Sequence, residues 1–144
     1  MFALTWASGA SVGFVQISEL AAAAGTTPRA LRFYEQAGLL MAARDDRGYR
    51  EYDDADLAVV RQIRSLADIG FTLEETRPFV DCLRAGNECG DVCAGSIETY
   101  RRKLEALDAA ITDLQRSRQT IAAALDAVSA RHITTPTSTR STED

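Results

Sequence analysis

The chain has 144 residues and is acidic, with 21 aspartates and glutamates against 16 lysines and arginines and a net charge of −5. This length accommodates one small domain and one long helix, and it excludes two independent enzymatic domains. No apolar run reaches the roughly 18 residues that a membrane-spanning helix needs. Residues 1–14 lack the basic start of a secretory signal, so we expect a cytoplasmic protein with a disordered N-terminal extension.

The first two predicted helices are short and meet at a glycine. Apolar residues between Ile17 and Ala24 recur on one helical face, and Gly25 then supplies a backbone position that other residues resist. Thr27 is a good N-cap for a second helix that Gly38 ends. Two short helices joined by about three residues form a helix-turn-helix unit.

The second of these helices carries two arginines on one face. Arg29 and Arg32 are three residues apart and therefore share a face that Leu31 does not. One face of the helix can pack while the other meets phosphates and base edges. We therefore expect double-stranded DNA to be the ligand.

A small β-hairpin is predicted directly after this pair. Residues 46–48, Asp-Arg-Gly, suit a turn, and Tyr49 and Tyr52 have the aromatic character of strand residues. A hairpin beside a recognition helix is a wing, and its arginines can reach neighbouring phosphates. The predicted wing carries three arginines, Arg44, Arg47 and Arg50.

Three strings in this order, LRFYEQAGLL, RDDRGYREY and IRSLADIGFTLEE, resemble the signature of the MerR family of bacterial transcription regulators. The resemblance covers about residues 15–83. It implies a homodimer, joined by an antiparallel coiled coil, that distorts a promoter whose polymerase-binding elements are too far apart. RNA polymerase is therefore an implied partner. The matching DNA-contact positions are Arg32, Tyr34, Arg44, Tyr49 and Arg50, with Arg29 as an addition.

For each tyrosine, packing in the core or the hairpin is an equal alternative to DNA contact. Beyond the wing, Asp53 or Asp54 can cap a helix that ends near Gly70, and another helix runs from Leu73 through Val80. The resemblance implies that these two helices support the wing and join the head to the dimer helix.

Apolar residues at alternating spacings of three and four define the longest predicted helix. A helix over 97–131 with one such stripe needs a partner, which favours self-association as a coiled coil. Arg118 interrupts the stripe at a core position, where a polar residue selects register at some cost in stability. The stripe consists of Ile97, Tyr100, Leu104, Leu107, Ile111, Leu114, Ile121, Leu125 and Val128.

Three cysteines, Cys82, Cys89 and Cys93, lie at or near the segment 84–96. They could bind a soft metal ion or form a disulfide switch, since Cys89 and Cys93 would share a face if helical. Alternatively, Cys82 is a small buried residue and the other two line a loop. A permanent disulfide is not expected in a reducing cytoplasm. No cysteine follows Cys93, which excludes a complete copper-type or zinc-type sensor loop of the family.

The sequence thus predicts a mostly helical fold with a β-hairpin wing, consisting of a winged helix-turn-helix head and a long dimerisation helix. The expected segments are an extension (1–14), the head (15–83), a hinge or effector loop (84–96), the coiled coil (97–131) and a disordered tail (132–144). Since no catalytic motif is recognisable, we expect a non-enzymatic DNA-binding regulator, responding to a thiol-reactive signal or a soft metal. Alternatives are an effector-independent regulator with structural cysteines, or a coiled-coil adaptor whose head binds protein.

Overall fold

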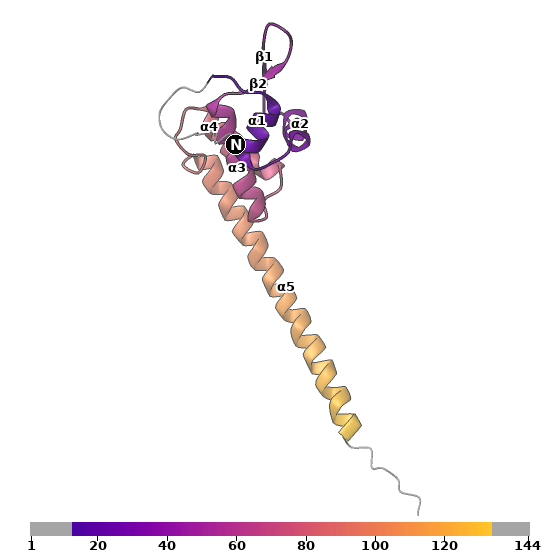
Figure 1. The fold of residues 1–144 in the computed structure, drawn as a ribbon. Coiled ribbons are helices and arrows are strands. Elements are labelled where there is room, and N and C mark those ends of the chain that lie inside the picture. The colour runs from indigo at the N-terminus through magenta and orange to yellow at the C-terminus, as the bar shows by residue number, and fades with distance from the viewer. Residues whose placement is uncertain (1–12, 134–144) are drawn as a thin grey trace, which may run out of the picture. The chain divides into compact units, whose positions relative to one another are not determined.

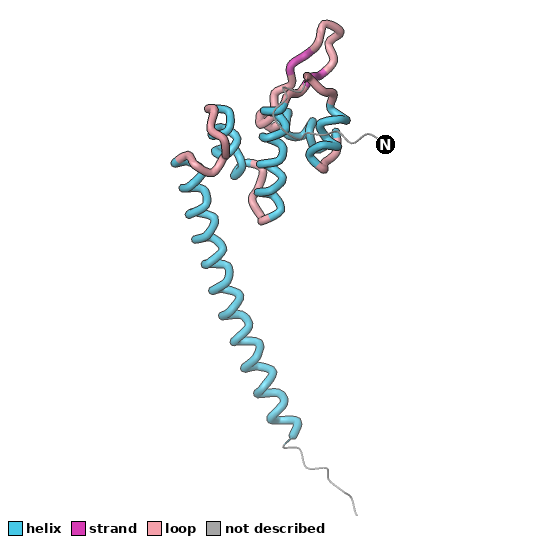
Figure 2. The backbone as a smooth tube through the Cα atoms, turned by 60° about the vertical axis from the view of Figure 1, so that its left-hand side comes forward, coloured by secondary structure: helices cyan, strands magenta, loops and turns pink. Residues whose placement is uncertain are grey.

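The computed structural model describes residues 13–133. The predicted extension and tail therefore lie almost wholly outside the described residues. The chain divides into two units, Met1–Arg101 and Arg102–Asp144. Helices dominate, and the only strands among the described residues form one two-stranded sheet (Figures 1 and 2). This agrees with the predicted fold class.

The first two helices form the predicted helix-turn-helix. Helix α1 spans Ile17–Ala24 and α2 spans Pro28–Gln36, and the two helices contact each other. Gly25 ends α1 in the left-handed conformation with φ 67°, which a side chain would strain. The Thr27 hydroxyl accepts a hydrogen bond from the Ala30 N–H at 3.2 Å, so it caps α2 as expected. Local sequence signals therefore set both boundaries.

The wing is an antiparallel hairpin of strands β1 (Ala43–Arg44) and β2 (Arg50–Glu51). The strands are short, and the turn between them is held by backbone hydrogen bonds between Asp45 and Gly48 and between Asp45 and Tyr49, and by the Asp45 carboxylate. Asp45 Oδ1 accepts hydrogen bonds from the backbone N–H groups of Arg47 and Tyr49, both at 2.9 Å. Gly48 completes the turn with φ 83°. The hairpin is the pink and magenta loop beside α1 and α2 in Figure 2.

Tyr52 belongs to the core and is not exposed on the wing. It pairs with Val15 through two backbone hydrogen bonds of 2.8 and 2.9 Å, and its side chain is fully buried. Of the two roles considered for this tyrosine, DNA contact and packing, the structure shows packing in the core. The surrounding core cluster consists of Val15, Leu20, Ala21, Leu31, Leu40, Tyr52, Leu57 and Val60.

Two further helices close the head. Helix α3 spans Asp54–Asp68, and a short 3-10 turn, η1 (Glu74–Thr76), leads into α4 (Arg77–Arg84). Asp53 caps α3, because its side chain accepts from the Asp56 N–H at 3.0 Å. Helices α3 and α4 pack on each other. A second core cluster lies between them, formed by Leu39, Val59, Ile63 and Val80.

Asp56 is a buried carboxyl in this layer, and its burial raises the pKa to about 6. The folded protein then binds more protons than the unfolded chain between about pH 4 and pH 6, so this group's contribution to stability falls as the pH rises. We expect the unfolding free energy of Asp56→Asn, relative to the natural protein, to rise by up to about 3 kcal/mol from pH 4 to pH 7. Urea denaturation at both pH values measures this difference.

The exposed Asp46→Asn variant is the matched control for this titration. A difference between Asp56→Asn and the natural protein that stays constant from pH 4 to pH 7 would contradict the buried titration.

Helix α5 spans Ala94–Ile133 and includes 40 residues. Its apolar stripe is largely exposed, with 70% of Leu114 and 46% of Leu107 accessible. Tyr100 departs from the predicted stripe, because its ring packs edge-on against Phe71 and Phe79 with centroids 5.7 and 5.0 Å away. The first turns of α5 thus belong to the N-terminal unit. Among the described residues, no helix has the length and apolarity of a membrane span.

Candidate nucleic-acid interface

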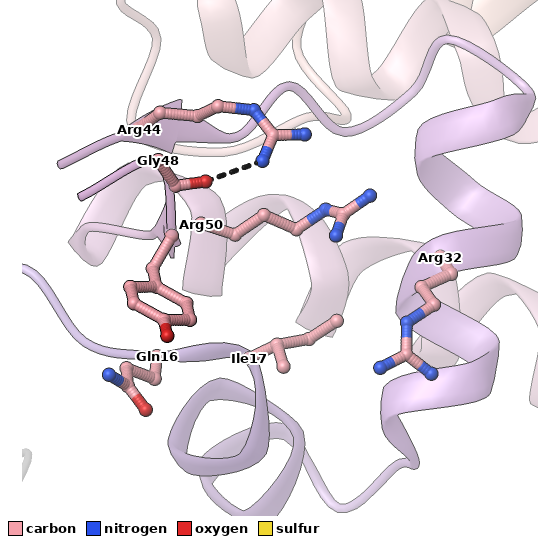
Figure 3. Close-up of a pocket in the computed structure, with 7 residues that line it drawn as sticks. Gln16, Ile17, Arg32, Arg44, Gly48 and Arg50 are labelled. Carbon is pink, nitrogen blue, oxygen red and sulfur yellow. Dashed lines mark hydrogen bonds between the residues drawn. The ribbon is translucent and has the colours of Figure 1, made fainter.

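Three arginines, one from α2 and one from each strand of the wing, meet at one hollow in the surface. The hollow has a volume of about 270 Å³, and Arg32 of α2 faces Arg44 and Arg50 of the wing across it (Figure 3). The remaining lining residues are Gln16, Ile17, Gly48 and Tyr49. The structure therefore brings together four of the residues that the sequence singled out for DNA contact.

Arg32 lies on the exposed face of α2. Leu31 beside it is fully buried, whereas Arg29 and Arg32 are exposed, as the three-residue spacing predicts. Phe33 is on the exposed side too, with 57% of its surface accessible. An apolar ring on a solvent-facing helix is suited to contact with thymine methyl groups. Sequence reasoning missed Phe33, because helical spacing does not reveal which aromatic residue the core leaves outside.

Arg44 and Arg50 are directly opposite each other in the hairpin register. Like charges in this arrangement are destabilising unless something neutralises them. Arg44 Nη1 donates to the Gly48 carbonyl at 2.7 Å, and Arg50 Nε donates to Glu35 Oε2 at 2.9 Å. Glu35 is the one carboxylate that contacts this arginine cluster in the described structure. The hollow therefore has a local positive charge that suits an anion.

The other predicted contact residues are more dispersed. Tyr34 is half-buried and packs against both main core clusters, so its ring supports α2. Tyr49 is 61% exposed and lines the hollow. Arg29 and Arg47 are exposed but lie outside the hollow lining. Their contact with DNA stays a prediction.

Besides Phe33, three residues in or beside the hollow were not singled out from the sequence for DNA contact. Gln16 and Ile17 line the hollow from the start of α1. Glu35 reaches the wing from the end of α2, and it also accepts a hydrogen bond from the Tyr52 hydroxyl. A usable signal was present for Glu35, which is the only acidic residue in the α2 sequence PRALRFYEQ.

The three cysteines do not converge on one point. The sequence argued against a permanent disulfide, but Cys82 of α4 and Cys93 are disulfide-bonded in the structure with a Cα–Cα distance of 5.8 Å, and Cys89 remains a half-buried thiol. The Asn87 side-chain amide donates to the Cys82 carbonyl at 2.8 Å. Cys89 lies in the loop before α5, so it does not share a helical face with Cys93. Within residues 13–133, no group of three His, Cys, Asp or Glu residues could hold a metal ion.

Two family profiles match the chain. The first, described as a MerR HTH family regulatory protein, matches residues 15–81. The second, described as "MerR, DNA binding", matches residues 57–124. Together they cover the helix-turn-helix, the wing, α3, α4 and most of α5.

Several curated relatives are similar over most of the chain. An HTH-type transcriptional regulator of Pseudomonas aeruginosa is 34% identical over 70% of this chain and 80% of its own length. The heavy metal-dependent transcription regulator 2 of Rhizobium meliloti is 31% identical over 65% of this chain and 67% of its own length. The nodulation protein NolA of Bradyrhizobium elkanii is 36% identical over 79% of this chain, but the chain spans 55% of that relative.

The chain spans an even smaller share, 28%, of a second NolA protein from another Bradyrhizobium strain.

Among solved structures, HiNmlR, a MerR family regulator lacking the sensor domain and bound to promoter DNA, has a TM-score of 0.51 at 24% identity. This similarity covers 74% of this chain and 79% of that one. A MerR family regulator from Listeria monocytogenes has a TM-score of 0.52 at 20% identity, covering 83% and 89%. Both structures share the fold.

Proposed function

The chain belongs to the MerR family of helix-turn-helix regulatory proteins, and we propose that it binds promoter DNA with the face formed by α2 and the wing. The observation that carries this proposal is the arginine-lined hollow between Arg32, Arg44 and Arg50. Backbone phosphates supply most of the affinity of proteins for DNA, and arginine is well matched to them in charge and geometry. Promoter DNA in the HiNmlR structure is consistent with this assignment.

The negative net charge of the chain is compatible with DNA binding. The field that a phosphate meets is set by nearby side chains, and the hollow gathers three guanidinium groups with one carboxylate in contact. Acidic residues elsewhere would weaken attraction to DNA of any sequence. The overall charge of −5 therefore favours selective binding over non-specific coating.

We further propose that the protein acts as a homodimer, with α5 as the dimer helix. The exposed stripe from Leu104 to Val128 gives each copy an apolar face that a second copy can cover. Two heads joined in this way would bind a palindromic promoter element. Distortion of that element, with RNA polymerase as the partner that responds, is the expected mode of regulation.

Selection from random-sequence duplexes with the full chain tests this function. We expect recovery of an inverted repeat, referred to below as the operator, and an affinity that falls steeply as salt concentration rises. Recovery of no enriched sequence, together with affinity that salt does not change, would favour the alternative of a coiled-coil adaptor whose head binds protein.

For the effector, we propose a thiol-reactive signal or a soft metal that acts through the cysteine region; the metal version requires reduction of the Cys82–Cys93 disulfide, because the described residues of the oxidised protein include no group of three ligands. Cys89 carries the thiol that the Cys82–Cys93 disulfide leaves available. Thiolates are ligands for soft metals and targets of oxidants. The name of the Rhizobium meliloti relative, a heavy metal-dependent regulator, supports the metal version.

We expect Cys89→Ser to retain operator affinity and to lose any transcriptional response to soft metals or oxidants. Affinity should persist because Cys89 lies outside α2 and the wing. Transcription in vitro with the natural protein, Cys89→Ser and the triple Cys→Ser variant measures the response. Identical regulation by all three under metal, oxidant and reductant would leave the effector-independent alternative, in which the cysteines are structural.

A further inference from the structure

The carboxylate of Glu35 links the recognition helix to the wing. Glu35 near the end of α2 accepts a hydrogen bond from Arg50 Nε on β2, at 2.9 Å to Oε2. Its other oxygen, Oε1, accepts from the hydroxyl of Tyr52, the residue after β2. The Glu35 side chain is only 16% exposed, whereas Arg50 is 38% exposed, so the carboxylate is largely shielded from water while the arginine remains accessible.

Tyr52 fixes the orientation of this carboxylate. Its backbone is paired with Val15, and its ring lies in the core. Burial, and then the hydrogen bond to Glu35, raises the pKa of the Tyr52 hydroxyl, so it remains a proton donor at neutral pH. Rotation of Glu35 would leave this buried hydroxyl without its acceptor, which is costly.

Arg50 gains a defined direction from the same carboxylate. Its Nε is engaged by Glu35, and its guanidinium extends toward α2, which carries Arg32 (Figure 3). An arginine side chain samples many rotamers when nothing holds it, and that freedom is lost when it binds a phosphate. Side-on pairing through Nε restricts the rotamers in advance and leaves the outer Nη groups for a second anion.

A carboxylate beside the proposed DNA-binding hollow would repel phosphate, yet Glu35 also pairs with Arg50 there. We propose that Glu35 is a positioning residue for DNA recognition, which holds Arg50 in the orientation that a backbone phosphate requires. The Tyr52 hydroxyl fixes Glu35 in turn. This inference rests on the proposed function, because it assumes that Arg50 faces DNA.

Glu35→Asp tests the role without changing the charge. The shorter side chain cannot reach both Arg50 and Tyr52, so we expect operator affinity to fall about five- to tenfold. In an Arg50→Ala background, the same substitution should cause no further loss. The Nε–H proton of Arg50, followed by NMR, should also exchange faster with water in Glu35→Asp. A loss of stability that leaves the protein folded would not cause this change. The exposed Glu88→Asp is the control.

Tyr52→Phe provides a second route if Glu35→Asp does not fold, as judged by circular dichroism. It removes only the hydroxyl, and we expect a smaller loss of affinity that again disappears in the Arg50→Ala background. Equal losses with and without Arg50 would overturn the positioning role, as would unchanged affinity in both variants. If Arg32→Ala and Arg50→Ala bind DNA like the natural protein, the proposed DNA face is wrong and the positioning role falls with it.

Discussion

Leu114→Asp is expected to leave the protein monomeric and to abolish operator binding at micromolar concentration. Leu114 lies in the middle of the α5 stripe and is 70% exposed in the single chain. In a dimer the new carboxylate would be buried without a partner, which costs several kcal/mol. A monomer can hold only one half of a palindromic site, so the second head no longer adds to its affinity. Leu107→Asp should behave in the same way.

Sedimentation velocity at micromolar concentration measures the change in assembly, and operator titration measures its effect on binding. Ala109→Asp is the matched control, because it adds the same charge to α5 outside the stripe. The control should remain dimeric. Leu114→Asp that sediments as a dimer would mean that the interface lies elsewhere on the chain.

The double variant Arg32→Ala/Arg50→Ala should lose roughly a hundredfold in operator affinity at moderate salt concentration. In the proposed dimer, which has two heads, each substitution would remove one arginine–phosphate interaction per head. The plot of log affinity against log salt concentration has a negative slope, and its magnitude should decrease by about one unit for each interaction lost. The expected decrease is about four units for the double variant and about two for Arg50→Ala alone. Fluorescence anisotropy at several salt concentrations gives both quantities.

Arg61→Ala is the control for general charge loss, because Arg61 is an exposed arginine of α3 outside the hollow. We expect it to change the slope much less. An unchanged affinity and slope in the double variant would refute the assignment of Arg32 and Arg50 to the DNA face.

The helix-turn-helix could be predicted from sequence because local chemistry determines it. Gly25 ends α1 with a positive φ, and the Thr27 hydroxyl caps α2. Each of these signals depends on residues within a few positions. The apolar stripe of α5 is local in the same sense, since it is a repeat along one helix.

The long-range interactions that shape the site could not be read in this way. Glu35 and Arg50 are fifteen residues apart, and nothing in their spacing reveals that they meet. Tyr100 fits the heptad pattern but packs with Phe71 and Phe79, because the first turns of α5 also have an aromatic cluster to contact. Periodicity identifies an apolar face without identifying what covers it.

Hydrogen–deuterium exchange of the full chain, with and without its selected operator duplex, tests most directly whether α2 and the wing form the DNA-binding face. We expect slower exchange on DNA binding across α2 and across the wing segment Arg44–Arg50, with Arg32→Ala/Arg50→Ala reducing both effects. Slower exchange confined to α4 and the cysteine loop, with α2 and the wing unchanged, would contradict DNA recognition by this face.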